Sequence, residues 1–295
     1  MSVTERVHGF GADDALTGIV TLPAEPQLAA STGRPFVILL NAGIVHRVGP
    51  YGMSVQLARS LAARGFRVLR FDQSGLGDSS PRPGNAPIEE QVIADGRAAM
   101  DSIAERYGAS SFVVGGLCSG ALNAHRICVA DERVVGLWLL DGYAYPTRRY
   151  HQHVFMRRIR SPRAWGALSR RIFDRARARL RGLRGGAGPE VPSPTAQGDE
   201  RMAIFYQDWP AIADARRDIE QMLGRGVRMH FVYTGGWSMF IDARQFDDMF
   251  PRLVRRDQIR VTYYPWADHS FLALQDRSAM LHDVVEFVNT LPPSA

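Results

Sequence analysis

Cys118 has the surroundings that a covalent nucleophile needs. It follows a short predicted strand at 111–114 and a tight turn, it precedes a predicted helix at 119–130, and Gly116 and Gly120 lie two residues to either side of it. A nucleophile on a strand–turn–helix requires small residues at these two places because the turn brings neighbouring backbone very close. The spacing therefore predicts that Cys118 forms the tip of a nucleophile elbow.

The size of the flanking residues decides the register of this elbow. If Ser119 were the nucleophile, the flanking positions would hold Leu117 and Ala121, and leucine is too large for such a turn. A cysteine at a helix N-terminus also meets the positive end of the helix dipole, which favours the reactive thiolate. The second cysteine, Cys128, lies between apolar residues in the middle of the predicted helix and is expected in the core.

His269 is the predicted base. It lies in the loop between the last predicted strand, 259–264, and the last predicted helix, 277–291. A histidine in this loop can hold the Cys118 thiolate as an ion pair and then carry a proton between the reacting groups. Its neighbour Asp268 is expected to serve the loop itself rather than to orient the imidazole.

The acid that would orient His269 has more than one candidate. The loop after the predicted strand 228–233 has no carboxylate in its first turn, and Asp242 comes late in that loop. Asp141 directly follows the predicted strand 134–140, at the sheet edge where the sites of open α/β sheets gather. We favour Asp141, place Asp242 second, and leave open a Cys–His pair without a carboxylate, since a thiolate needs less activation than a hydroxyl.

An alternation of strands and helices must position these residues. Continuous apolar runs predict buried strands at 35–40, 66–71, 111–114, 134–140, 228–233 and 259–264. Helical patterns separate these runs, and such alternation is typical of an α/β fold with a mostly parallel sheet and helices on both faces. The segment 6–22 is expected to add an antiparallel hairpin at the sheet edge.

The alternation stops after the strand that ends near Asp141. We therefore predict a core built from 1–142 and 219–295, interrupted by a helical lid at 143–218. Within this lid, the stretch 148–184 holds thirteen arginines and one acidic residue, Asp174. Such a stretch is either a solvated cationic face or a docking surface for an anionic partner, namely an acyl carrier protein, the phosphates of coenzyme A or a membrane surface.

Composition excludes several classes of protein. The chain has a net charge of +6 and is 45% hydrophobic, which is ordinary for a globular protein. No apolar run approaches the roughly 18 residues of a membrane helix, and no signal peptide is evident, so we expect a cytoplasmic protein without stable membrane insertion. No nucleic-acid recognition motif and no metal-ligand spacing occur, and the glycines at 75 and 77 fit no phosphate-binding motif. We expect no cofactor, no metal and no nucleic acid.

Together these residues resemble the α/β-hydrolase superfamily over nearly the whole chain. A narrower resemblance, to bacterial exosortase-A-associated hydrolases and similar biosynthetic-cluster hydrolases, is carried by Arg47-Val48-Gly49, Leu57-Ala58-Arg59, Gly65, Arg70-Phe71-Asp72, Gly75 to Ser79 and Gly116-Leu117-Cys118. The cysteine nucleophile also looks like that of dienelactone hydrolases. The resemblance implies an α/β-hydrolase fold with Cys118, His269 and an acid as a triad, although the missing carboxylate after 228–233 departs from the common pattern.

The resemblance also implies an oxyanion hole. One half would be the backbone N–H of Ser119, the residue after the nucleophile. The loop 41–50 would supply the second N–H, from Gly43 or Ile44. His46 and Arg47 in the same loop could reach a substrate carbonyl or phosphate, or could simply anchor the loop.

The function that these residues favour is acyl transfer, or hydrolysis of an ester or thioester, through an S-acyl intermediate on Cys118. The acyl substrate would be delivered on coenzyme A or on an acyl carrier protein that docks on the basic lid. The alternative is a hydrolase-like protein that binds a ligand or partner without turnover. An esterase that uses Ser119 is disfavoured by the register of the elbow.

Overall fold

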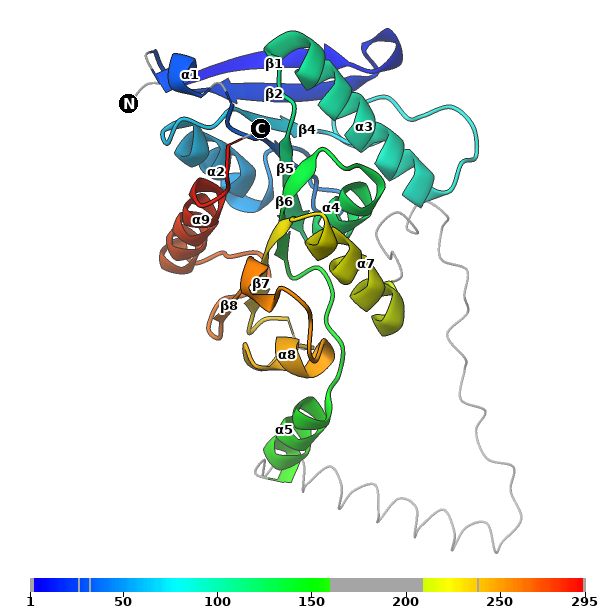
Figure 1. Cartoon of the computed structure of the whole chain (residues 1–295), viewed down its shortest axis with the longest axis vertical. Coiled ribbons are helices and arrows are strands. Elements are labelled where there is room, and N and C mark those ends of the chain that lie inside the picture. Colours follow the sequence, from blue (N-terminus) through cyan, green and yellow to red (C-terminus); the bar gives the residue numbers. More distant parts are fainter. Residues whose placement is uncertain (1–2, 26, 32, 160–208, 238, 294–295) are drawn as a thin grey trace, which may run out of the picture.

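The computed structural model describes residues 3–25, 27–31, 33–159, 209–237 and 239–293. Over these residues the chain forms an eight-stranded sheet in the order β1-β2-β4-β3-β5-β6-β7-β8 (Figure 1). The strands are β1 (Thr4–Phe10), β2 (Leu16–Leu22), β3 (Phe36–Leu39), β4 (Val68–Phe71), β5 (Phe112–Leu117), β6 (Val134–Leu140), β7 (Arg228–Thr234) and β8 (Ile259–Tyr264).

The pairing of the strands confirms the predicted α/β architecture. β2 runs antiparallel to β1 and to β4, so the first two strands form the expected hairpin at one edge. From β4 to β8 every pairing is parallel. β5 is longer than its predicted range 111–114, because Gly115 and Gly116 still pair with Trp138 and Leu139. The Trp138 ring fills the space beside Gly115, where a side chain would otherwise lie.

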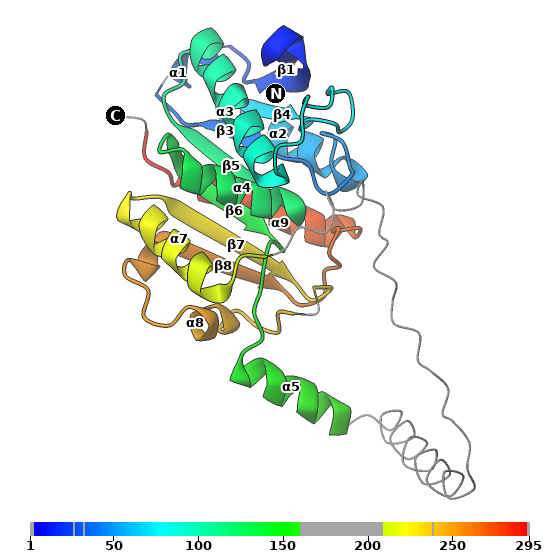
Figure 2. The same ribbon diagram turned by 90° about the vertical axis from the view of Figure 1, so that its right-hand side faces the viewer.

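Helices cover both faces of this sheet (Figures 1 and 2). The helices of the described residues are α1 (Gln27–Ala30), α2 (Met53–Ala62), α3 (Ile88–Tyr107), α4 (Ser119–Ala130), α5 (Arg148–Ile159), α7 (Ile212–Gly224), α8 (Gln245–Met249) and α9 (Leu274–Asn289). α2 and α9 lie on one face, and α3, α4 and α7 lie on the other. Along β3, Val37 and Leu39 pack on the side of α2 and α9. Phe36 and Ile38 pack on the side of α3, α4 and α7. Burial on both sides explains the unbroken apolar run of this strand.

The segment after β6 leaves the sheet. α5 lies apart from the helices that cover the sheet, next to α8 (Figure 1), and Arg149 forms an ion pair of 3.0 Å with Asp248 of α8. Residues 160–208, and with them most of the arginine-rich stretch, lie outside the described residues. α7 begins at Ile212 and packs on α4, with Ala215 and Ile219 fully buried. None of the described helices is long and apolar enough to cross a bilayer.

The layer between the sheet, α2 and α9 offers a test of the fold. Leu61 of α2 is completely buried in it. We expect Leu61→Ala to lower the free energy of unfolding by about 2–5 kcal/mol, because the removed methyl groups leave a cavity. The matched control is Val254→Ala, at a side chain that is 72% exposed, where a change within about 0.5 kcal/mol is expected. Equal effects of the two changes in urea denaturation would contradict the packing.

Candidate active site

Cys118 lies at a sharp turn between β5 and α4. β5 ends at Leu117, α4 begins at Ser119, and the backbone of Cys118 between them has a φ of 57°. Such a conformation is uncommon for a residue other than glycine and costs on the order of 1–3 kcal/mol, which the surrounding structure must supply. Cys118 is half-buried, whereas Cys128 is fully buried, as predicted. Burial raises the pKa of Cys128 to about 12, so this thiol stays protonated.

The two glycines that flank the elbow are required by close backbone contacts. A methyl group on Gly116 would lie 2.8 Å from the carbonyl carbon of Gly120. A methyl group on Gly120 would collide with the carbonyl oxygen of Asn41, in the loop after β3. Both positions therefore require glycine, as predicted from the sequence, and Gly120 in addition lets the loop after β3 approach Cys118.

Asp141 and His269 are joined by a hydrogen bond. Nδ1 of His269 donates to Oδ2 of Asp141 over 2.8 Å, and the Asp141 side chain is fully buried. Thr234, at the end of β7, also binds this carboxylate: its backbone N–H donates to Oδ1 over 2.9 Å and its hydroxyl donates to Oδ2 over 2.6 Å. Three hydrogen bonds, one from His269 and two from Thr234, therefore satisfy this buried carboxylate.

The charge of His269 follows from its neighbours. Burial lowers the pKa of His269, but the hydrogen bonds and charges of Asp141 and Cys118 outweigh this effect and raise the pKa to about 9. The imidazole is therefore protonated at neutral pH.

The other two carboxylates near this region serve local turns. Oδ1 of Asp242 accepts hydrogen bonds from backbone amides at the start of α8, the closer one at 2.8 Å. Asp268 accepts from the backbone and hydroxyl of Ser270 within its own loop, as predicted. Of the carboxylates considered from the sequence, the structure brings Asp141 to His269.

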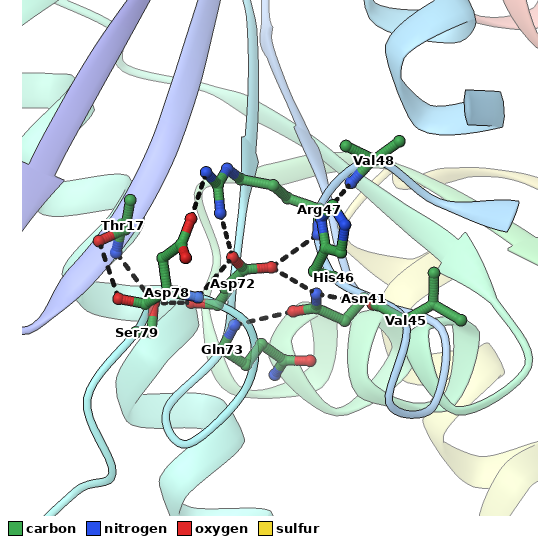
Figure 3. Close-up of polar contacts among 10 residues, drawn as sticks. All are labelled: Thr17, Asn41, Val45, His46, Arg47, Val48, Asp72, Gln73, Asp78 and Ser79. Carbon is green, nitrogen blue, oxygen red and sulfur yellow. Dashed lines mark hydrogen bonds and ion pairs between the residues drawn. The ribbon is translucent and has the colours of Figure 1, made fainter. Parts of the chain in front are cut away.

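A buried polar cluster holds the loop 41–50 (Figure 3). At its centre is the fully buried Asp72, whose Oδ1 accepts from the side chain of Asn41 over 3.0 Å and from the backbone of Arg47 over 2.6 Å. The Arg47 guanidinium binds both Asp72 and Asp78. Arg47 therefore anchors the loop, which was one of its two expected roles. The segment 71–79 that carries both aspartates is a structural turn, as expected from its lack of a phosphate-binding motif.

Two of the residues expected to supply oxyanion donors, Gly43 and Ser119, are in contact at the elbow. The backbone N–H of Gly43 donates to the hydroxyl oxygen of Ser119 over 2.7 Å, which ties the loop after β3 to the first residue of α4. An oxyanion would therefore have to replace this hydroxyl to use Gly43. Ile44, the other expected donor, has a side chain that is 69% exposed. His46 accepts from the backbone of Val48 over 3.4 Å, within the loop.

Two residues that contact Asp141 or His269 were not predicted from the sequence. Thr234 binds Asp141, and the indole of Trp237 stacks on the imidazole of His269 with ring centroids 4.9 Å apart and planes 19° apart. Thr234 is the last residue of β7 and Trp237 lies in the loop that follows, where a carboxylate was expected. A threonine at a strand end and an aromatic residue in a glycine-rich loop are too common to reveal such contacts by themselves.

The comparisons with known proteins agree with this architecture. The model of a hydrolase family described as serine aminopeptidase S33 matches residues 37–234, which is more than half of the chain. The chain therefore belongs to this family of α/β-hydrolase-fold proteins, although the residue at its elbow is a cysteine. None of the curated proteins matches the chain in sequence.

Several solved structures share the fold over nearly their whole length. An esterase from Pyrococcus furiosus has a TM-score of 0.59 and 11% identity, covering 98% of this chain and 92% of its own. A dienelactone hydrolase from Anabaena variabilis has a TM-score of 0.54 and 11% identity, covering 98% and 99%. A proline iminopeptidase from Mycobacterium smegmatis has a TM-score of 0.52 and 18% identity, covering 97% and 98%. At these identities the similarity establishes the α/β-hydrolase fold.

Removal of the charge on Asp141 tests the coupling to His269. We expect Asp141→Asn to lower the pKa of His269 by about 1–3 units from its value of about 9, because the neighbouring carboxylate is lost. NMR titration of the His269 ring protons measures this change, with Asp242→Asn as the control that leaves the pKa of His269 unchanged.

The same pKa predicts how stability depends on pH. Because the pKa of His269 in the folded state lies above the ordinary 6.5, the pair of His269 and Asp141 stabilises the fold fully below pH 6.5, and this contribution is lost as pH rises through about 9.

The cluster around Asp72 predicts a second, structural effect. We expect Asp72→Ala to lower the free energy of unfolding by about 3–5 kcal/mol, because the guanidinium of Arg47 loses its buried partner. Asp78→Ala removes a partner of the same guanidinium whose side chain is 66% exposed, and it should cost no more than about 1 kcal/mol. If the two variants unfold at the same denaturant concentration, Asp72 does not have the anchoring role described here.

Proposed function

We propose that the chain is a cysteine-nucleophile hydrolase or acyltransferase that acts on an ester or thioester through an S-acyl intermediate on Cys118. The observation that carries this proposal is the chain of contacts from Cys118 through the protonated His269 to the buried Asp141. A nucleophile at a strained elbow, beside a base that a carboxylate orients, is the arrangement that covalent acyl chemistry needs.

In the first step, the thiolate of Cys118 attacks the acyl carbon of the substrate. A C–S bond forms, and the carbonyl oxygen takes up negative charge next to the amides at the start of α4 and in the loop 41–50. The bond between the acyl carbon and the leaving oxygen or sulfur then breaks. His269 gives its proton to the leaving group, so the alcohol or thiol departs neutral. The acyl group remains on Cys118 as a thioester.

In the second step, His269 accepts a proton from the incoming nucleophile. With water as this nucleophile, the thioester bond breaks, a carboxylic acid is released and the thiolate–imidazolium pair is restored. With an alcohol or amine, the same step transfers the acyl group. Asp141 holds the imidazole by Nδ1 throughout, which leaves Nε2 to exchange protons with the reacting groups.

A thioester donor fits this site because thiolates exchange readily with thioesters. Delivery on coenzyme A or on an acyl carrier protein is the substrate source that the arginine-rich lid suggests. The narrower resemblance to exosortase-A-associated hydrolases stays a prediction, as does a cytoplasmic location.

Covalent trapping tests the nucleophile. We expect incubation with a short-chain acyl thioester, such as an S-acyl N-acetylcysteamine, to add one acyl group to the wild-type protein in intact-mass spectrometry. Peptide mapping should place it on Cys118. Cys118→Ala should remain unacylated, and its rate of thioester hydrolysis should fall at least 1,000-fold, since the nucleophile is lost.

Ser119→Ala is the matched control at the adjacent position. We expect this variant to be acylated still, with a modest change in rate because the hydroxyl that binds Gly43 is lost. If instead Ser119→Ala were inert and Cys118→Ala active, serine chemistry would replace the present proposal.

A second candidate function is ligand or partner binding without turnover. The observation that favours it is the engagement of the Gly43 amide by Ser119, which occupies one of the expected oxyanion donors. Failure of the wild-type protein to react with acyl thioesters and with a cysteine-directed reagent such as iodoacetamide would support this candidate over the covalent one.

A further inference from the structure

The loop after β7 lies directly against the loop that carries His269. The backbone N–H of Gly235 donates to the carbonyl of Tyr264 over 2.8 Å, and that of Gly236 donates to the carbonyl of Ala267 over 3.0 Å. A methyl group on Gly236 would lie 2.7 Å from the backbone nitrogen of His269. Side chains at these two positions would push the loops apart, so the glycine pair permits the contact.

This approach places the indole of Trp237 on the face of the His269 imidazole. The ring centroids are 4.9 Å apart and the planes differ by 19°, so the rings stack nearly parallel. The indole also contacts the ring of Trp209, with centroids 5.6 Å apart, and Trp209 in turn contacts the ring of Tyr145, with centroids 6.3 Å apart. The indole N–H is buried and has no hydrogen-bond partner among the described residues. Among the described residues the indole therefore makes ring contacts only, while the backbone N–H of Trp237 donates to the carbonyl of Thr234 over 3.1 Å.

The imidazole of His269 is thus held on its edge and on its face. Asp141, from the end of β6, accepts from Nδ1, and Cys118, from the elbow, is the second side chain whose hydrogen bond raises the pKa of the ring. Both are hydrogen-bond partners, whereas Trp237 contacts the flat face of the ring. The face of an indole carries negative electrostatic potential and attracts a cation placed over it. It therefore favours the imidazolium over the neutral imidazole.

We propose that Trp237 is a positioning residue for His269. The indole of Trp237 stabilises the imidazolium of His269 and keeps the imidazole in the plane in which it contacts both Asp141 and Cys118. The role rests on the proposed function, because the charged imidazole matters only if it pairs with the Cys118 thiolate and later donates its proton. The aromatic residue lies in the loop after β7, where the sequence lacks the expected carboxylate.

NMR titration of His269 in the full chain tests this proposal without any need for turnover. We expect Trp237→Leu to lower the pKa of His269 by about 0.5–1.5 units, and Trp237→Phe, which retains a weaker aromatic face, to lower it by less. The sign of the shift is decisive. If Trp237 merely covered the imidazole, its loss would let water in, and the pKa would rise because burial lowers it.

Trp209→Leu is the matched control, since Trp209 belongs to the same group of stacked rings and packs on Trp237. We expect it to leave the pKa of His269 unchanged. A rise or no shift in Trp237→Leu, or an equal fall in Trp209→Leu, would overturn the proposal. Circular dichroism establishes that each variant is folded, and should the leucine variant fail to fold, Trp237→Phe and Trp237→Tyr carry the same test.

Acyl trapping on the wild-type protein separates the two proposals. If Cys118 becomes acylated but Trp237→Leu leaves the titration of His269 unmoved, the positioning role fails while the proposed function stands. If the leucine variant lowers the pKa of His269 but no adduct forms on Cys118, the positioning role holds and the proposed function fails. In a working enzyme, we expect Trp237→Leu to slow the alkylation of Cys118 by iodoacetamide at neutral pH, because a less favoured imidazolium leaves a smaller fraction of Cys118 as the reactive thiolate.

Discussion

The close approach of three backbone segments at the elbow is the constraint on which the rest of the site depends. The turn at Cys118 brings Gly116 against Gly120, and Gly120 against the carbonyl of Asn41. Any side chain at Gly120 would separate the elbow from the loop after β3. The contact between Gly120 and Asn41 therefore brings the loop after β3, with the amide of Gly43, next to the elbow that carries Cys118. This amide is one of those expected to bind a carbonyl oxygen.

Two buried carboxylates hold this arrangement in place from opposite sides. Asp72 binds the backbone and side chains of the loop 41–50, chiefly through Asn41 and Arg47. Asp141 binds Thr234 and His269 and so joins the ends of β6 and β7 to the loop after β8. Each is a charge that is costly to bury without partners, and each has several. The stability of the loops and the geometry of the site are thus supported by the same interactions.

Strain and charge are concentrated at the same residues. Cys118 and Asp141 both have positive φ values, of 57° and 45°, although neither is a glycine. Such conformations persist only where the surroundings hold them, and they gather where chemistry requires a particular side-chain direction. The imidazole of His269 lies between these two residues in the contact chain and is kept protonated by them. The stacked indole of Trp237 completes its surroundings on the open face.

Local sterics and periodicity were enough to predict much of this protein from its sequence. The apolar runs located the parallel strands, and the glycines around Cys118 set the register of the elbow, because both depend on residues adjacent in the chain. For the partner of His269, Asp141 was favoured over Asp242 and over a Cys–His pair without a carboxylate, but the sequence did not decide among them. The contacts of Trp237 and Gly43 were not foreseen. These depend on where loops from separate strands end relative to one another, which the lengths and twists of the whole sheet decide. Only the tertiary structure could therefore decide that Asp141 binds His269, that Trp237 stacks on the His269 imidazole, and that Asp242 binds the amides at the start of α8.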